Sequence, residues 1–338
     1  MLNMRRGVFE VIAMLLVGAV AGCGGGDSSS PTAPTPVATP TASVSSVTFS
    51  GTVTNIVTGV RVGGATVTIG SVSATSSADG TYSLAVTPAG QASFSVSASG
   101  YYTRQSAVSM TGATTINPEI IPQGDGFDLV FFDHIFRDGS KGTTRWLTQP
   151  SFEIWTQIFQ CIGHCSTYEA TATSVPAYFE ARAREAIALV SDLTGGTVVG
   201  PVVTTKTHAV GTSVSLNPVG PGSITFMYAD KFDNAVEGGR TSVFPGGAGV
   251  AFTGGLLSFS QAQGSASRNN SIYIHKMAHS VGFYPGHTVN LSLVSGPSIM
   301  GPDPVVVTTK DRLHAKILYK RPVGNMSPDR DPSGVTIN

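Results

Sequence analysis

Residues 270–283 read NSIYIHKMAHSVGF, and this stretch decides the fold and chemistry expected of the chain. We predict that a helix begins near Asn270. His275 and His279 are four residues apart, so both imidazoles project from one face of that helix. Two imidazoles at this spacing can bind one tetrahedral Zn²⁺ ion. Two partly exposed histidines on an amphipathic helix would show the same spacing, so the pair alone does not define a site.

The residues after this helix follow an order that resembles a known family. Gly282 and Phe283 come directly after it, followed by Pro297-Ser-Ile-Met-Gly301, a segment led by Asp311, and Arg321-Pro-Val-Gly-Asn325. This order resembles the matrixin-like zinc peptidases of bacteria, which belong to the metzincin clan. The resemblance is close over residues 270–335 and loose over 126–270. It implies an α+β, zincin-like domain over residues 126–338, with Gly282 turning the chain out of the helix and Met300 as the Met-turn methionine beneath the metal.

Two positions depart from the metzincin pattern. Lys276 occupies the place of the glutamate that takes a proton from zinc-bound water, and an ammonium group cannot accept a proton. Losing such acid–base help typically costs about 10²–10⁴ in rate. Pro285 occupies the place of the third metal ligand. We assign His287, two residues later, as the third ligand, with a solvated loop residue as the alternative.

Other charged residues and histidines are given structural roles. Asp311 is interpreted as a helix N-cap. His314, in the same predicted helix, is interpreted as structural, and His134 as a surface or hydrogen-bonded strand residue. Asp329 and Asp331 could suggest calcium, but two acids in a tail are more simply solvated.

The N-terminus predicts export. Residues 1–23 combine Arg5 and Arg6 with a short apolar run and end in Val-Ala-Gly-Cys23, which resembles the lipobox of bacterial lipoproteins. We therefore predict lipidation of Cys23 and attachment to a membrane of the cell envelope. A plain secretory signal with an incidental cysteine is the alternative. Residues 24–46 are rich in Ser, Thr and Pro and are expected to form a flexible tether.

Cys161 and Cys165 remain once Cys23 is assigned. In an oxidising compartment their spacing favours a small disulfide loop. His164 raises the alternative of a zinc knuckle, although two cysteines and one histidine do not complete such a site.

Residues 47–122 alternate apolar and small polar side chains in several short runs, which predicts an antiparallel β-sandwich. The runs GTVTN, GGATVTI, ADGTYSLAV and SFSVSASGYY resemble the carboxypeptidase regulatory-like domain, a transthyretin-like sandwich. The resemblance implies an accessory module without catalytic groups.

The segment after Pro122 predicts mixed structure. Phe127–Phe132 is interpreted as an apolar strand, and residues 177–193 as a helix with Pro176 at its start. Strands are expected over 198–204, 212–216 and 224–228, and the Gly-rich stretch 244–257 as a loop or edge strand.

The balance of charge argues against nucleic acid as a partner, since twenty basic residues oppose twenty acidic ones. Three functions remain. The first is an envelope lipoprotein with a catalytically impaired, zinc-peptidase-like domain that binds a protein or peptide. The second is an active zinc endopeptidase, and the third is a non-enzymatic adhesive or peptide-binding protein.

Overall fold

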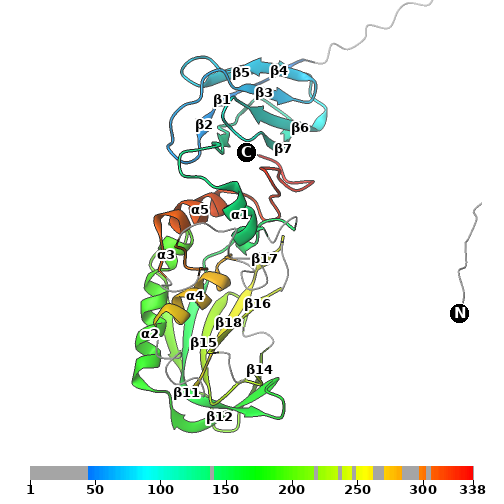
Figure 1. The fold of residues 1–338 in the computed structure, drawn as a ribbon. Helices are drawn as coiled ribbons and strands as arrows, with labels where there is room; N and C mark the ends of the chain where they lie inside the picture. Colours follow the sequence, from blue (N-terminus) through cyan, green and yellow to red (C-terminus); the bar gives the residue numbers. More distant parts are fainter. Residues whose placement is uncertain are drawn as a thin grey trace, which may run out of the picture. The chain divides into compact units, whose positions relative to one another are not determined.

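Residues 47–120 form two small sheets that share one apolar core (Figure 1). The computed structural model describes residues 45–137, 141–216, 220–234, 238–245, 249–261, 270–283, 297–301 and 306–337. One sheet has the strand order β5-β1-β8, the other has the order β4-β3-β6-β7, and β2 pairs separately with β9. These strands are β1 (Val47–Thr52), β2 (Thr54–Asn55), β3 (Thr66–Ile69), β4 (Val72–Thr75), β5 (Thr81–Val86), β6 (Gly90–Ser97), β7 (Arg104–Met110), β8 (Thr114–Thr115) and β9 (Glu119–Ile120).

The alternation of the sequence builds the core between these sheets. In β5, Tyr82, Leu84 and Val86 are buried and the residues between them are exposed. They meet Phe49 of β1 and Val96 of β6 in a single cluster. Burial of an apolar side chain of this size contributes about 1.5–3 kcal/mol, so a one-residue shift of β5 would be strongly unfavourable. Two sheets on one core are present, but the antiparallel pairing predicted from the alternation is wrong for two strand pairs, because β1 and β8, and β2 and β9, run parallel.

The second domain is a mixed α/β structure with a curled, half-barrel sheet. Its seven-stranded sheet has the order β14-β12-β11-β15-β18-β16, and β13 also pairs with β11. Strands β13, β15 and β18 run parallel to their neighbours in this set, and β16 closes one end antiparallel to β18. The strands are β10 (Arg145–Trp146), β11 (Ser151–Ile162), β12 (Thr167–Ser174), β13 (Val203–Lys206), β14 (Ser213–Ser215), β15 (Ser223–Ala229), β16 (Gly239–Phe244), β17 (Ala251–Phe252) and β18 (Gly254–Ser260).

Five helices accompany this sheet in the described part of the chain, and α2 and α4 contact it directly. Phe179 of α2 and Tyr273 of α4 meet Phe259 of β18 in the same apolar core. The predicted helix over 177–193 is divided, because α2 ends at Ala188 and a short α3 follows. The helices are α1 (Leu129–Phe136), α2 (Ala177–Ala188), α3 (Val190–Leu193), α4 (Asn270–Ser280) and α5 (Thr309–Lys320).

The strand predicted over Phe127–Phe132 is wrong, since Leu129–Phe136 is the helix α1. Asp128 is its N-cap, and the side chain accepts a hydrogen bond from the Phe131 amide. Buried residues at 131, 132, 135 and 136 lie on one face of a helix. A short apolar run fits either a strand or a buried helix, and the cap decides between them here.

The prediction that Asp329 and Asp331 are solvated is also wrong. Asp329 is fully buried and Asp331 nearly so, rather than solvated. Arg321 donates two hydrogen bonds to the Asp329 carboxylate, both at 2.7 Å. Residues 330 and 336 form parallel bridges with Gln105 and Ala107, so the end of the chain extends the sheet of the N-terminal domain at β7.

Candidate functional site

Helix α4 presents the histidine pair on its less buried side. Tyr273, Ile274, Met277, Ala278 and Ser280 face the core, whereas His275, Lys276 and His279 are only partly buried. The helix packs against α2, β16 and β18. The hydroxyl of Thr241 in β16 donates to the main-chain oxygen of Lys276 at 3.1 Å, which fixes the helix beside that strand.

Both imidazoles are oriented by main-chain carbonyls. The ring centroids of His275 and His279 are 4.7 Å apart, with the ring planes nearly perpendicular. Nδ1 of His275 donates to the oxygen of Ile299 at 2.8 Å, and Nδ1 of His279 donates to the oxygen of Phe283 at 2.7 Å. A carbonyl oxygen can only accept, so the proton of each neutral ring lies on Nδ1. The lone pair of each ring therefore lies on Nε2, the arrangement that metal-binding histidines usually have.

The segment that orients His275 is held by one carboxylate. Asp311 is fully buried and accepts hydrogen bonds from the Ser298 hydroxyl at 2.6 Å and the Ile299 amide at 3.1 Å. The same carboxylate accepts from the amide and hydroxyl of Thr308. Thr308 is thus the N-cap of α5, and the prediction that Asp311 is the cap is wrong. Asp311 is the third residue of a capping box that begins at Thr308. The sequence shows this spacing, but the spacing alone does not decide which of the two residues is the N-cap.

Replacing Asp311 with Ala should destabilise the protein by about 2–4 kcal/mol, because several buried donors would lose their acceptor. Urea unfolding of the wild type and the variant measures this difference. An Arg312→Gln variant is the matched control, since Arg312 is the next residue and its contacts are exposed: an ion pair with Asp192 and a hydrogen bond donated to the oxygen of Val307. A loss no larger than that of the control would contradict the anchoring role of Asp311.

The turn after α4 is held from two other elements. Trp146 Nε1 donates to the oxygen of Ser280 at 2.7 Å, and the Tyr319 hydroxyl donates to the oxygen of Val281 at 2.8 Å. Burial raises the pKa of Tyr319, which keeps this hydroxyl a donor. Gly282 has φ +121°, and a Cβ there would lie 2.7 Å from the oxygen of Thr144. Only glycine fits this turn, and the turn presents the Phe283 carbonyl to His279.

The other histidines lie elsewhere. His314 is fully buried in α5, where Nε2 accepts from the Asp128 amide and Nδ1 donates to the oxygen of Lys310. Burial lowers its pKa, so it is neutral and structural. His134 lies on α1 rather than on a strand.

No third ligand accompanies the pair within the described ranges, which contain no cluster of three His, Cys, Asp or Glu able to hold a metal. His287 and Pro285 lie outside the described residues. Met300 is buried next to Ile299, in the segment that Asp311 anchors.

Cys161 and Cys165 form a disulfide across the turn between β11 and β12. Both thiols are used in this bond, so the zinc-knuckle alternative with His164 has no thiolate ligands. Cys23 lies outside the described residues. Within the described part of the chain, no helix is both long and apolar enough to cross a membrane.

Comparison with known proteins identifies the N-terminal domain. Residues 48–120 match the carboxypeptidase regulatory-like domain, which confirms the resemblance of residues 47–122. No curated protein matches the chain. One solved structure that it resembles is a protein of unknown function from Bacteroides fragilis, provisionally described as membrane-associated, with 20% identity and a TM-score of 0.21. That match covers 46% of each chain, so the chain spans less than half the length of that protein.

Proposed function

We propose that this chain is an exported, lipid-anchored protein whose C-terminal domain is metzincin-like, binds zinc and peptides, and has lost most of its hydrolytic activity. The observation that carries the proposal is the paired orientation of His275 and His279. Each ring donates from Nδ1 to a main-chain carbonyl, which puts the lone pair of each neutral ring on Nε2, the nitrogen with which such histidines bind a metal, on adjacent turns of one helix.

The two histidines of α4 suit zinc. Two neutral imidazoles one helical turn apart are ordinary ligands of a tetrahedral zinc ion, and His287 is proposed as the third. Zinc bound there would polarise a peptide carbonyl or a water molecule. The protein's own contribution is to hold both rings in one tautomer, through Ile299 and Phe283.

Lys276 explains why hydrolysis is expected to be weak. It is partly buried on α4 between the two histidines in sequence. Its ammonium group adds positive charge beside a cation site and does not accept a proton, so the position that should move a proton from water to the leaving amine is occupied by a group of the wrong kind.

Strand β16 supplies a means of binding an extended peptide. It is the last strand of its sheet, and among the described residues it pairs only with β18. Its residues after Gly239 are partly exposed, and Thr241 ties it to α4 at Lys276. A peptide that added to this edge by main-chain hydrogen bonds would lie next to the histidine helix, with specificity left to alternate side chains.

Zinc content is the direct test. The purified full chain, dialysed after loading, should retain about one zinc ion by elemental analysis, the stoichiometry of one tetrahedral site. His275→Ala and His287→Ala should both lose it. His164→Ala is the matched control, because His164 is exposed in the disulfide loop and should not affect retention. A wild-type chain that retains no zinc would refute the metal assignment, and retention in His287→Ala would refute the third ligand alone.

A further inference from the structure

The last residues of the chain form a strap that runs along the N-terminal domain. The strap comprises residues 326–337 and runs parallel to β7. The Gln105 amide donates to the oxygen of Asp329, the Asp331 amide donates to the oxygen of Gln105, and the Ile337 amide donates to the oxygen of Ala107, at 2.8–2.9 Å. Strand β7 of the N-terminal domain therefore supplies the edge with which the C-terminal segment pairs.

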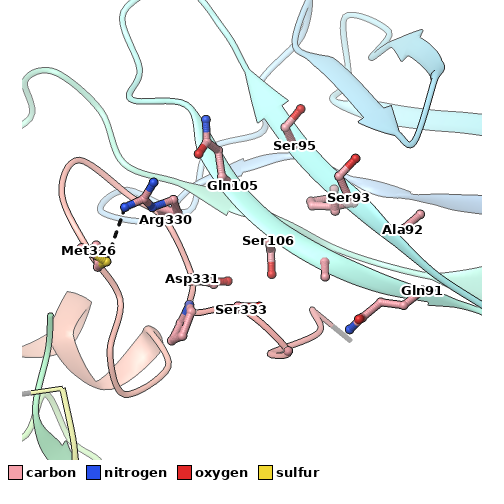
Figure 2. A pocket seen from close by; sticks show the side chains of 14 residues that line it. Gln91, Ala92, Ser93, Ser95, Gln105, Ser106, Met326, Arg330, Asp331 and Ser333 are labelled. Carbon is pink, nitrogen blue, oxygen red and sulfur yellow. Dashed lines mark hydrogen bonds between the residues drawn. The ribbon is translucent and has the colours of Figure 1, made fainter. Parts of the chain in front are cut away.

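The strap is densely anchored at one end and loosely packed along the rest. Between it and strands β6 and β7 lies an open hollow of about 820 Å³ (Figure 2). Ser93 and Ser95 line it from β6, Gln105 from β7, and Met326 and Arg330 from the strap. Arg330 contacts the Met326 sulfur at 3.5 Å across this exposed region. Ile337 packs against the apolar core of the N-terminal domain but is partly exposed, and the strap has no fully buried apolar side chain. Few buried apolar contacts are the property of segments that open locally.

At the anchored end, a buried ionic cluster joins the strap to both domains. Asn325 Nδ2 donates to Asp329 at 3.1 Å and to Asp331 at 2.8 Å. Arg104 of β7 reaches the Asp331 carboxylate at 3.3 Å, and Arg321 at the end of α5 binds Asp329. Burial lowers the pKa of Arg104, with the charge of Arg321 adding to the effect. The cluster therefore pairs two buried arginines with two buried aspartates, and removing any one of these charges would leave its partner buried without its ion pair.

The same cluster continues to the turn after α4. The Asn325 amide donates to the Thr143 hydroxyl at 3.1 Å, and the Thr143 amide donates to the oxygen of Asn325 at 3.0 Å. Arg145, two residues on, donates to the oxygen of Arg321 at 2.9 Å. The next residue is Trp146, whose indole holds the oxygen of Ser280. Polar contacts, joined by the backbone of residues 143–146, thus lead from β7 to Ser280, the last residue of α4 before the turn that presents the Phe283 carbonyl to His279.

We propose that the strap is a clasp which, when closed on β7, fixes the turn after α4 and with it the imidazole of His279. Arg104 is then a positioning residue in the N-terminal domain for a metal ligand in the other domain. The importance of His279 rests on the function proposed above, but the mechanical coupling does not require zinc. Opening the clasp would loosen residues 281–283 and lower the affinity of the histidine pair for a metal.

Hydrogen exchange of the full-length protein tests the coupling without any metal. Arg104→Met should raise amide exchange in the strap and at residues 281–283 by about tenfold or more, since both would open together, while amides of β15 keep their protection. Arg330→Met is the matched control, with an exposed arginine of the same strap removed, and should change neither region. Should Arg104→Met fail to fold, Arg104→Lys should show the same pattern at smaller amplitude.

Two results would overturn the clasp. One is faster exchange in the strap with residues 281–283 unchanged, which would remove the coupling. The other is unchanged exchange in both regions, which would show that Arg104 does not hold the strap. Zinc retention measured on the same samples separates this proposal from the proposed function. A wild type without zinc refutes the metal site and leaves the exchange result standing, whereas a zinc-binding wild type should exceed Arg104→Met in affinity.

Discussion

A zinc-loaded Lys276→Glu variant should cleave casein about 10²–10⁴ times faster than the natural chain, which is the range that a positioned acid–base group contributes. A glutamate at this position could accept a proton from water and deliver it to the leaving amine, and it would offset the charge of the ion. The lysine ammonium does neither. Initial rates of casein cleavage, measured at equal zinc occupancy, give the ratio.

A Lys276→Gln variant separates the two effects of the substitution. It removes the positive charge without supplying a base, so it should bind zinc at least as well as the natural chain yet remain nearly inactive. If the natural chain cleaves casein at a rate close to that of Lys276→Glu, the protein is an active endopeptidase and the impaired-enzyme proposal is wrong.

Replacing Arg321 with Met should lower the free energy of unfolding by about 3–5 kcal/mol, because the Asp329 carboxylate would remain buried without the guanidinium that binds both of its oxygens. Both side chains of this pair are fully buried, and the guanidinium donates to both carboxylate oxygens. Urea denaturation of the full chain, with the slope compared between variants, measures the loss.

The exposed pair Arg184 and Glu180 on α2 provides the control. Both partners are more than 40% exposed, so Arg184→Gln should cost only about 0.3–0.5 kcal/mol. An Arg321→Met/Asp329→Leu double variant should recover part of the loss, since no unpaired charge remains. A single Arg321→Met loss as small as that of Arg184→Gln would mean that water reaches the cluster and that the strap is not held by it.

Local sequence patterns were enough to predict much of the secondary structure. Alternation with turn residues between the runs predicts the strands of the N-terminal domain, because a half-buried strand needs that period. Spacing also places His275 and His279 on one helix. The same reasoning failed at Phe127–Phe132, where an apolar run fits two structures and the Asp128 cap selects the helix.

The errors at the acidic residues have a different cause. The sequence predicts Asp311 as the N-cap, but its carboxylate instead binds Thr308, the actual N-cap, together with Ser298 and Ile299, thirteen and twelve residues away. In the sequence, Asp329 and Asp331 cannot be told from solvated residues of a polar tail. In the structure, Arg321 pairs with Asp329 and Arg104 pairs with Asp331. Whether a carboxylate is solvated or paired depends on which distant cation reaches it, and no local period encodes that.

The stretch NSIYIHKMAHSVGF by itself determined that His275 and His279 share one helical face and that a lysine follows the first of them, because the faces of a helix follow from spacing within adjacent turns. Only the tertiary structure decided the orientation and the tautomer of the two imidazoles. The Ile299 and Phe283 carbonyls fix the tautomers of the two histidines, Asp311 fixes Ile299, and Trp146 and Tyr319 hold the turn before Phe283. These partners come from separate elements, and burial of one common core brings them to hydrogen-bonding distance.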